Sequence, residues 1–369
     1  MRFSLYTVLL SLTIPYYISA QNAPDNKQEE TERNLRIRAL ITDDEPAISY
    51  ALTERMRERK VNGVSVAVID KGEIVWAKGY GIKDAGIPNE AVDTPTLFQC
   101  ASIGKIITSL VALHLVKEGR ISLDEPVNNK LKSWKVPEND KTEEKKVTLR
   151  SLLSHTAGFD DDYGFEGYLP HSVLPNLQQM LNGELPSNAR KKLTLKTVPG
   201  TVERYSGGGF LIVQQLIEDV TGKSFAVYVD SIIFKPLSMW RTTYSYYPDE
   251  IPGITIARGH DEKGKTDKKR KYHVYPELAA AGPWTTATDL ARLVIEIQKE
   301  YNGLSTIIAD SDLIREMITP QINTTGLGIH LKGSENVSAF WHAGNTAGYT
   351  GLLFGTTSAS GCHCTHQFR

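Results

Sequence analysis

The feature that most constrains this chain is a long apolar segment, residues 98–119. Apolar residues after its first turn lie on almost every side of a helix, so a helix formed here has almost no polar face and must be buried in a larger body. Gly119 stands where such a helix would end, as is typical of a C-terminus. The segment therefore predicts a central helix that begins at Ser102 and around which the rest of the chain packs.

Two polar residues lie in the first turn of this predicted helix. Ser102 and Lys105 are three positions apart, so they share one face. A serine at a helix start is also the usual N-cap residue, and in that interpretation Ser102 has no catalytic role. In a catalytic reading, the buried lysine accepts the hydroxyl proton and the helix dipole stabilises the oxyanion. This is the S-x-x-K arrangement, which occurs once in the chain.

Composition and charge limit the classes of function. The chain has 369 residues, is 40% hydrophobic and carries a formal net charge of -1. This size suits one large core or two joined subdomains. The near-neutral charge gives no reason to expect a nucleic acid or an anionic membrane as partner. Its three cysteines, Cys100, Cys362 and Cys364, are too few for a disulfide framework, so a large core must supply the stability.

The N-terminal segment is typical of an exported protein. Residues 1–20 combine a positive start, an apolar stretch and a small-residue cleavage site at Ser19-Ala20, which predicts a signal peptide. A membrane anchor is the alternative, but the apolar stretch is too short and Pro15 interrupts it. Residues 21–43 are polar and unpatterned and predict a flexible lead-in. No later segment is long and apolar enough to span a bilayer, so we expect a periplasmic or secreted protein.

The order of predicted elements indicates an α+β fold. An amphipathic helix and a β-hairpin come first, a mainly helical insert follows, and strands with Gly-rich turns come last. This order predicts an antiparallel sheet built from both ends of the chain and flanked by helices, with the insert as a subdomain. The expected ranges are 45–60 for the helix, 63–70 and 73–79 for the hairpin, 123–284 for the insert, and 326–332, 339–342 and 349–356 for the strands. Thr148 is expected to cap a helix of the insert, and Thr286-Ala-Thr-Asp289 fits a capping box that starts another helix.

Two further motifs follow downstream. Tyr205-Ser-Gly-Gly-Gly places a tyrosine on a predicted tight turn before a helix, and the glycines permit positive φ or close backbone approach. A tyrosine beside an ammonium group can act as a general base, although a packed tyrosine before an ordinary turn is the alternative. Trp341-His-Ala-Gly-Asn345 is a predicted strand end on which His342 could line a cleft or be an ordinary edge residue.

Taken together, the motifs resemble those of the serine β-lactamase-like superfamily. Ser102-Ile-Gly-Lys105, Tyr205-Ser-Gly207 and His342-Ala-Gly344 occur in that order, as in the branch of class C β-lactamases, D-alanyl-D-alanine carboxypeptidases and related esterases. The likeness spans roughly residues 44–356. It also includes the connecting segments 121–126, 152–158, 234–237 and 281–287.

The resemblance implies a β-lactamase/transpeptidase-like fold and an acyl-enzyme hydrolase that needs no cofactor or metal. It implies that Ser102 is the nucleophile and Lys105 its proton acceptor. Tyr205 would pass the proton to the leaving group and later activate water. His342 would stand in place of the lysine of the third motif. The backbone N–H groups of Ser102 and Asn345 would bind the oxyanion.

The resemblance implies that Gly207 and Gly344 lie where the substrate binds, and two departures from the family pattern, at Gly207 and His342, affect that binding. Gly207 stands where lactamases and peptidases usually have an asparagine that contacts the substrate amide, which disfavours β-lactam hydrolysis. His342, in the motif that ends at Gly344, replaces a fixed positive charge with a side chain that is largely neutral near pH 7. We therefore expect an esterase or D-amino-acid peptidase acting on a small or peptide-like substrate. A β-lactamase and a non-catalytic sensor remain alternatives, and the oligomeric state stays open.

The last segment, residues 357–369, has no apolar periodicity. The family normally continues here with more strand and a closing helix. The composition therefore suggests a truncated or frame-shifted end that leaves an exposed sheet edge and an uncovered face. Cys362-His-Cys-Thr-His366 could bind a metal by composition, but an accidental sequence is the preferred reading.

Overall fold

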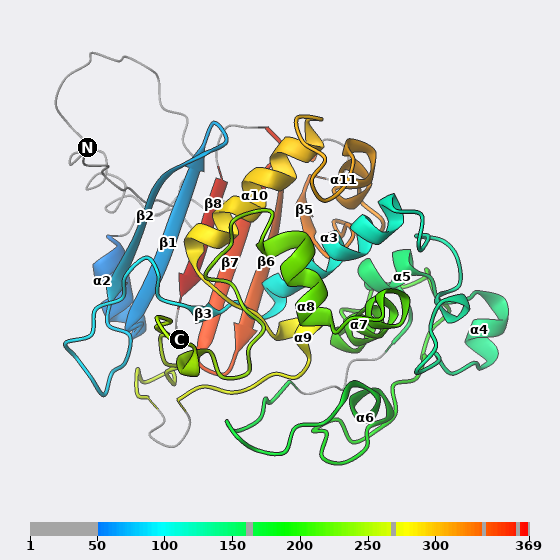
Figure 1. Cartoon of the computed structure of the whole chain (residues 1–369), viewed down its shortest axis with the longest axis horizontal. Coiled ribbons are helices and arrows are strands. Elements are labelled where there is room, and N and C mark those ends of the chain that lie inside the picture. The colour runs from blue at the N-terminus through cyan, green and yellow to red at the C-terminus, as the bar shows by residue number, and fades with distance from the viewer. Residues whose placement is uncertain (1–50, 160–164, 267–270, 334–336, 359–361, 368–369) are drawn as a thin grey trace.

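The sheet of this protein joins the two ends of the chain. The computed structural model describes residues 51–159, 165–266, 271–333, 337–358 and 362–367. In this part of the chain a six-stranded antiparallel sheet has the order β2-β1-β8-β7-β6-β5, with helices packed around it (Figure 1). The strands are β1 (Gly63–Asp70), β2 (Glu73–Gly81), β5 (His330–Lys332), β6 (Ala339–Thr346), β7 (Tyr349–Thr356) and β8 (Cys362–Gln367).

The predicted N-terminal hairpin is confirmed. Strands β1 and β2 pair antiparallel, and Lys71 and Gly72 form the turn with φ values of 51° and 75°. Two successive positive φ values give the turn the twist that a tight hairpin needs. Strand β1 is buried along nearly its whole length because it lies inside the sheet. Helix α2 (Leu52–Arg59) ends near residue 60 as predicted, and residues 45–50 of the expected helix lie outside the described part.

The prediction that residues 357–369 leave an exposed sheet edge is wrong. Strand β8 lies in the interior of the sheet, where residues 362–367 pair with both β1 and β7 (Figure 1). The prediction failed because it relied on apolar periodicity, whereas a strand between two others is held by backbone hydrogen bonds on both edges. The side chains of the Cys362-His-Cys-Thr-His366 cluster lie outside the description. The predicted signal peptide and lead-in, residues 1–43, do too.

Helix α10 (Ala287–Tyr301) covers one face of this sheet and packs on β1, β2, β7 and β8 (Figure 1). It begins as predicted at Thr286, whose side chain accepts a hydrogen bond from the backbone N–H of Asp289. The Asp289 carboxylate does not complete a capping box. It accepts hydrogen bonds from Thr242 and from the backbone N–H of Arg241, and so ties the insert to the sheet domain.

The predicted central helix is α3 (Gly104–Lys117), and its side chains from Ile106 to Leu113 are buried throughout. Fully burying one leucine or isoleucine contributes roughly 1.5–3 kcal/mol, so this helix anchors the core. It packs against three helices of the insert, α7 (Gly207–Thr221), α8 (Phe225–Val229) and α9 (Leu278–Ala281). The insert ends at a two-stranded sheet, in which β3 (Phe98–Gln99) pairs with β4 (Trp284–Thr285).

The insert holds more loop than helix, because most of its helices are short. Thr148 caps α5 (Leu149–Leu153) as predicted.

No described helix is long and apolar enough to cross a bilayer. The remaining helices are α4 (Asp140–Glu144), α5 (Leu149–Leu153), α6 (Leu177–Asn182), α7 (Gly207–Thr221), α8 (Phe225–Val229), α9 (Leu278–Ala281) and α11 (Ser311–Met317). Short 3-10 turns are η2 (Ala101–Ile103), η3 (Val127–Asn129) and η5 (Pro248–Glu250), and η4 (Asp230–Phe234) is a π-helical turn.

Candidate active site

Ser102 lies on a tight turn rather than at an α-helix start. It is the middle residue of η2, and α3 begins only at Gly104, which corrects the predicted boundary. The preceding residue, Ala101, has a φ of +50°, which a residue with a Cβ adopts at a cost of about 1 kcal/mol or more. The N–H of Cys100 donates to the carbonyl of Pro283, so the turn is held from the β4 side. The Ser102 side chain is therefore partly accessible, although the residues on either side of it are buried.

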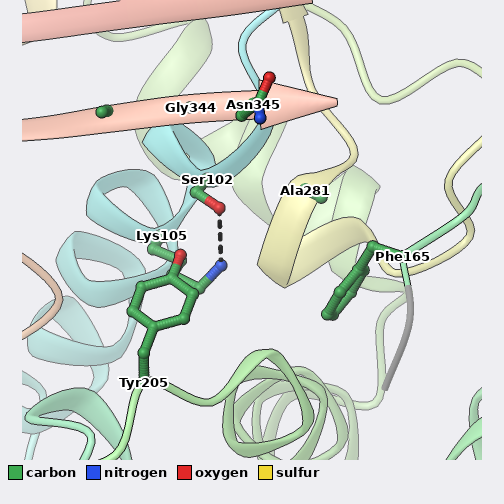
Figure 2. Close-up of a pocket in the computed structure, with 8 residues that line it drawn as sticks. Ser102, Lys105, Phe165, Tyr205, Ala281, Gly344 and Asn345 are labelled. Atoms are coloured by element: carbon green, nitrogen blue, oxygen red, sulfur yellow. Dashed lines mark hydrogen bonds between the residues drawn. The ribbon is translucent and has the colours of Figure 1, made fainter. Parts of the chain in front are cut away.

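Lys105 is buried directly beside Ser102. Its side chain is 1% exposed, and its Nζ donates to Ser102 Oγ at 3.2 Å (Figure 2). The same Nζ donates to the carbonyl of Ala280 at 2.8 Å. One turn further along α3, Thr108 donates to the carbonyl of Ala279. Backbone carbonyl groups of α9 thus hold the Lys105 side chain in place, which could not be predicted from the sequence.

Tyr205 reaches toward this pair from the insert (Figure 2). Lys105 Nζ lies 4.9 Å from the centre of its ring, within cation–π distance. The ring of His155 packs on it with 4.4 Å between centroids. The glycines after Tyr205 do not form the expected turn. They are the first turn of α7, none has a positive φ, and Gly207 is buried without lining the cavity at Ser102.

Strand β6 forms the opposite wall of the site. Ala343, Gly344 and Asn345 line the cavity, and their strand passes beside Ser102 (Figure 2). A Cβ placed on Gly344 would lie 2.1 Å from the carbonyl oxygen of Cys100, which is shorter than any real contact. Gly344 is therefore required for the close approach of β6 to η2.

His342 does not line this cavity, which corrects the expected position. Its side chain is 2% exposed, with its ring 6.3 Å from that of Tyr205 and 5.1 Å from that of His330. Burial, with the positive charge of Lys105, lowers the pKa of His342 to about 3, so the ring is neutral. Nδ1 donates to the carbonyl of Ala343, which leaves Nε2 as an acceptor with no partner among the described residues.

The cavity between these elements measures about 350 Å³. Phe165 and Ala281 complete its lining opposite Tyr205, and neither was singled out in the sequence (Figure 2). They come from a loop and a short helix, for which hydrophobic periodicity gives no signal. Within the described ranges, no group of three or more His, Cys, Asp or Glu side chains is placed to hold a metal ion.

The sequence profile of the beta-lactamase family matches residues 49–359. The chain belongs to the beta-lactamase family. This agrees with the resemblance of its three motifs and with the β-lactamase/transpeptidase-like fold. The octameric penicillin-binding protein homologue from Pyrococcus abyssi shares this fold, with a TM-score of 0.71 and 24% identity over 86% of this chain and 71% of that chain.

Two curated relatives of this beta-lactamase-family chain come from Staphylococcus aureus. Protein flp of strain N315 is 26% identical over 227 residues, which are 62% of this chain and 43% of the relative. The teichoic acid D-alanine hydrolase of strain MRSA252 is 26% identical over 278 residues, which are 74% of this chain and 63% of that protein. The chain thus spans less than two thirds of the length of either relative.

Proposed function

We propose that this protein is a serine hydrolase that forms an acyl-enzyme on Ser102. The observation that carries the proposal is the hydrogen bond of 3.2 Å between Lys105 Nζ and Ser102 Oγ at the wall of a cavity. A nucleophile within hydrogen-bond reach of a basic side chain, which is itself held by a third group, is the arrangement that nucleophilic catalysis requires. The third group here is the carbonyl of Ala280.

The reaction follows from the positions of these side chains. Ser102 Oγ bonds to the substrate carbonyl carbon while its proton passes to the amine form of Lys105. The bond from that carbon to the leaving group then breaks, and Tyr205 gives its phenolic proton to the departing atom, which leaves a phenolate beside the protonated Lys105. In the second half the phenolate takes a proton from water as the hydroxide bonds to the acyl carbon. The bond from that carbon to Ser102 Oγ then breaks, and Lys105 returns its proton to the serine oxygen.

The backbone N–H groups of Ser102 and Asn345 are the proposed oxyanion donors. The close approach of Gly344 to η2 supports this role, because it brings the strand that carries Asn345 beside the turn that carries Ser102. Fixed N–H groups at the position of the developing charge stabilise the tetrahedral intermediate without reorganisation. His342 would support this wall from within the protein, as a neutral ring behind Tyr205.

We propose a small acyl ester, of the D-aminoacyl type, as the substrate class. The small size of the cavity supports a short acyl group, and the relative named teichoic acid D-alanine hydrolase supports a D-alanyl ester. A neutral, buried His342 offers no fixed charge for the carboxylate of a β-lactam or a D-Ala-D-Ala peptide. Gly207 likewise brings no side-chain amide to the site.

Intact-mass spectrometry tests the proposal. The protein is treated with a fluorophosphonate and, separately, with benzylpenicillin, and Ser102→Ala serves as the control. We expect one fluorophosphonate adduct on the parent and none on the variant. A penicillin adduct that forms and clears would favour a β-lactamase, and one that persists would favour a peptidase. A folded parent without any adduct would refute the hydrolase and favour a non-catalytic sensor.

We further propose that the protein acts after export. The pattern of residues 1–20 supports this, since it combines a positive start, an apolar stretch and a small-residue cleavage site. Expression of the full chain in a bacterial host, followed by fractionation and N-terminal sequencing, tests it. We expect mature protein beginning at Gln21, and an unprocessed cytoplasmic product would contradict export.

A further inference from the structure

His155 is a buried residue of the insert that the proposed reaction does not use. It follows α5 and has a φ of +59°, in the left-handed region that a residue with a Cβ seldom adopts. Such backbone conformations persist where the surrounding structure enforces them, and they cluster at functional sites. In the sequence, His155 stands out only through its place in segment 152–158, which resembles the family.

The backbone on either side of Tyr205 is hydrogen-bonded to this one residue. The N–H of Arg204 donates to the carbonyl oxygen of His155 at 2.7 Å. The N–H of Ser206 donates to Nδ1 of the same histidine at 3.0 Å. His155 therefore holds the backbone N–H groups of the residues on both sides of the tyrosine, and its left-handed backbone lets the carbonyl and the ring bind the same short segment.

The side chain of Tyr205 also rests on this histidine. The two rings pack at 4.4 Å between centroids, and the second contact of the His155 ring is Phe210 at 5.3 Å. Tyr205 is 45% exposed, so burial alone does not fix its ring. Its orientation toward Lys105 depends on contacts of this kind.

The protonation state of His155 suits this arrangement. Because Nδ1 accepts from Ser206, the ring proton must be on Nε2 and the ring must be neutral. Burial, with the positive charge of Lys105, keeps the pKa of His155 well below its ordinary value. A cationic ring would present an N–H to the N–H of Ser206 and break the contact.

We propose that His155 is the positioning residue of Tyr205, holding it at Ser102 and Lys105 through hydrogen bonds to the residues on both sides. This inference rests on the proposed hydrolase function, in which Tyr205 moves the proton. His155 does not touch the reacting atoms. It sets where the tyrosine lies.

Two substitutions at His155 separate its acceptor from its ring. His155→Asn keeps an acceptor at the δ1 position and tolerates positive φ. His155→Phe keeps a ring but leaves the Ser206 N–H without its acceptor. His171 offers a matched control, because it has a φ of +61° and packs on Tyr247 at 4.4 Å while lying exposed elsewhere. His171→Phe thus imposes the same backbone strain next to a tyrosine outside the site.

Turnover of a p-nitrophenyl ester is measured per site titrated with the fluorophosphonate, so that unfolded protein does not count. We expect His155→Phe to lower kcat by about 10- to 100-fold with little change in KM, since a displacement near 1 Å costs about that much. His155→Asn should lose only about threefold, and His171→Phe should match the parent. If His155→Phe does not fold, His155→Gly replaces it.

Equal kcat in the parent and His155→Phe would overturn the inference, and so would His155→Asn failing as badly as His155→Phe. A second readout does not need turnover. With 3-fluorotyrosine at position 205, we expect one narrow 19F resonance in the parent and His155→Asn, and a shifted or broadened one in His155→Phe. If the parent carries no adduct on Ser102, the hydrolase proposal fails, and an unchanged resonance in His155→Phe would then refute the positioning role separately.

Discussion

Replacing Gly344 by alanine tests how closely β6 must approach the nucleophile. The new Cβ would stand 2.1 Å from the Cys100 carbonyl oxygen and 3.1 Å from the Cβ of Ala101. Real Cβ atoms essentially never come within 3.0 Å of such an atom, so the strand or the turn must move by about 0.9 Å. Both belong to larger elements, and the atom that Cβ meets is backbone, so the clash cannot be relieved by rotating a side chain.

The expected loss follows from that displacement. Moving β6 away from η2 separates the backbone N–H of Asn345 from that of Ser102, the two proposed oxyanion donors. A misplacement near 1 Å costs about 10²-fold in rate, equivalent to about 2.7 kcal/mol. Overpacking should also lower the free energy of unfolding by roughly 1–3 kcal/mol. We therefore expect Gly344→Ala to fold, to melt several degrees lower, and to lose kcat by about two orders of magnitude.

Ester hydrolysis per titrated site, with thermal melting in parallel, measures both effects. Gly355→Ala is the matched control, because its Cβ would meet the Phe340 ring at 2.4 Å within the same sheet but away from the cavity. It should lose stability and keep its kcat. If folded Gly344→Ala turns over at the parent rate, the close approach of β6 has no catalytic role and the assignment of Asn345 is refuted.

Three further predictions concern buried groups. Burial raises the pKa of Glu277 to about 7, so ionising this residue lowers the stability of the protein as pH rises from 4.5 through 7. In denaturant unfolding above pH 7, Glu277→Gln should therefore raise the free energy of unfolding by up to roughly 3 kcal/mol. No gain would contradict this. The lowered pKa of His342 has the opposite effect on stability, because the unfolded chain binds the proton at a higher pH than the folded chain does. Stability should fall as pH drops from 6.5 toward 3, and less steeply in His342→Gln; parallel pH profiles would refute it. Cys100 is fully buried, with its thiol pKa raised by burial, so iodoacetamide should modify it only after unfolding, and rapid native labelling would show otherwise.

Local signals in the sequence were sufficient for the elements whose stability is local. The hairpin at Lys71-Gly72 needs only two residues that accept positive φ between two β-rich segments. The caps at Thr148 and Thr286 depend on one side chain and one backbone N–H three positions away. The apolar helix from Gly104 onward was recognisable because it has no polar face.

Predictions failed where distant segments decide the structure. Residues 362–367 carry no strand pattern, yet pairing with β1 and β7 makes them part of the sheet. The 3-10 turn at Ser102 is imposed by packing against Pro283 and β6, which lie far along the chain. His342 was expected in the cleft, but the packing of β6 turns its side chain inward and leaves Ala343 at the cavity.

The residues available for catalysis can be read from the sequence: one S-x-x-K pair, a tyrosine before a helix and a glycine-containing third motif. Those are properties of residue type and spacing, and they also carry the resemblance to the beta-lactamase family. Tertiary packing brings Lys105 to Ala280, His155 to Tyr205 and Phe165 to the cavity. These contacts join segments that lie far apart in the sequence, so their geometry exists only once the core has packed.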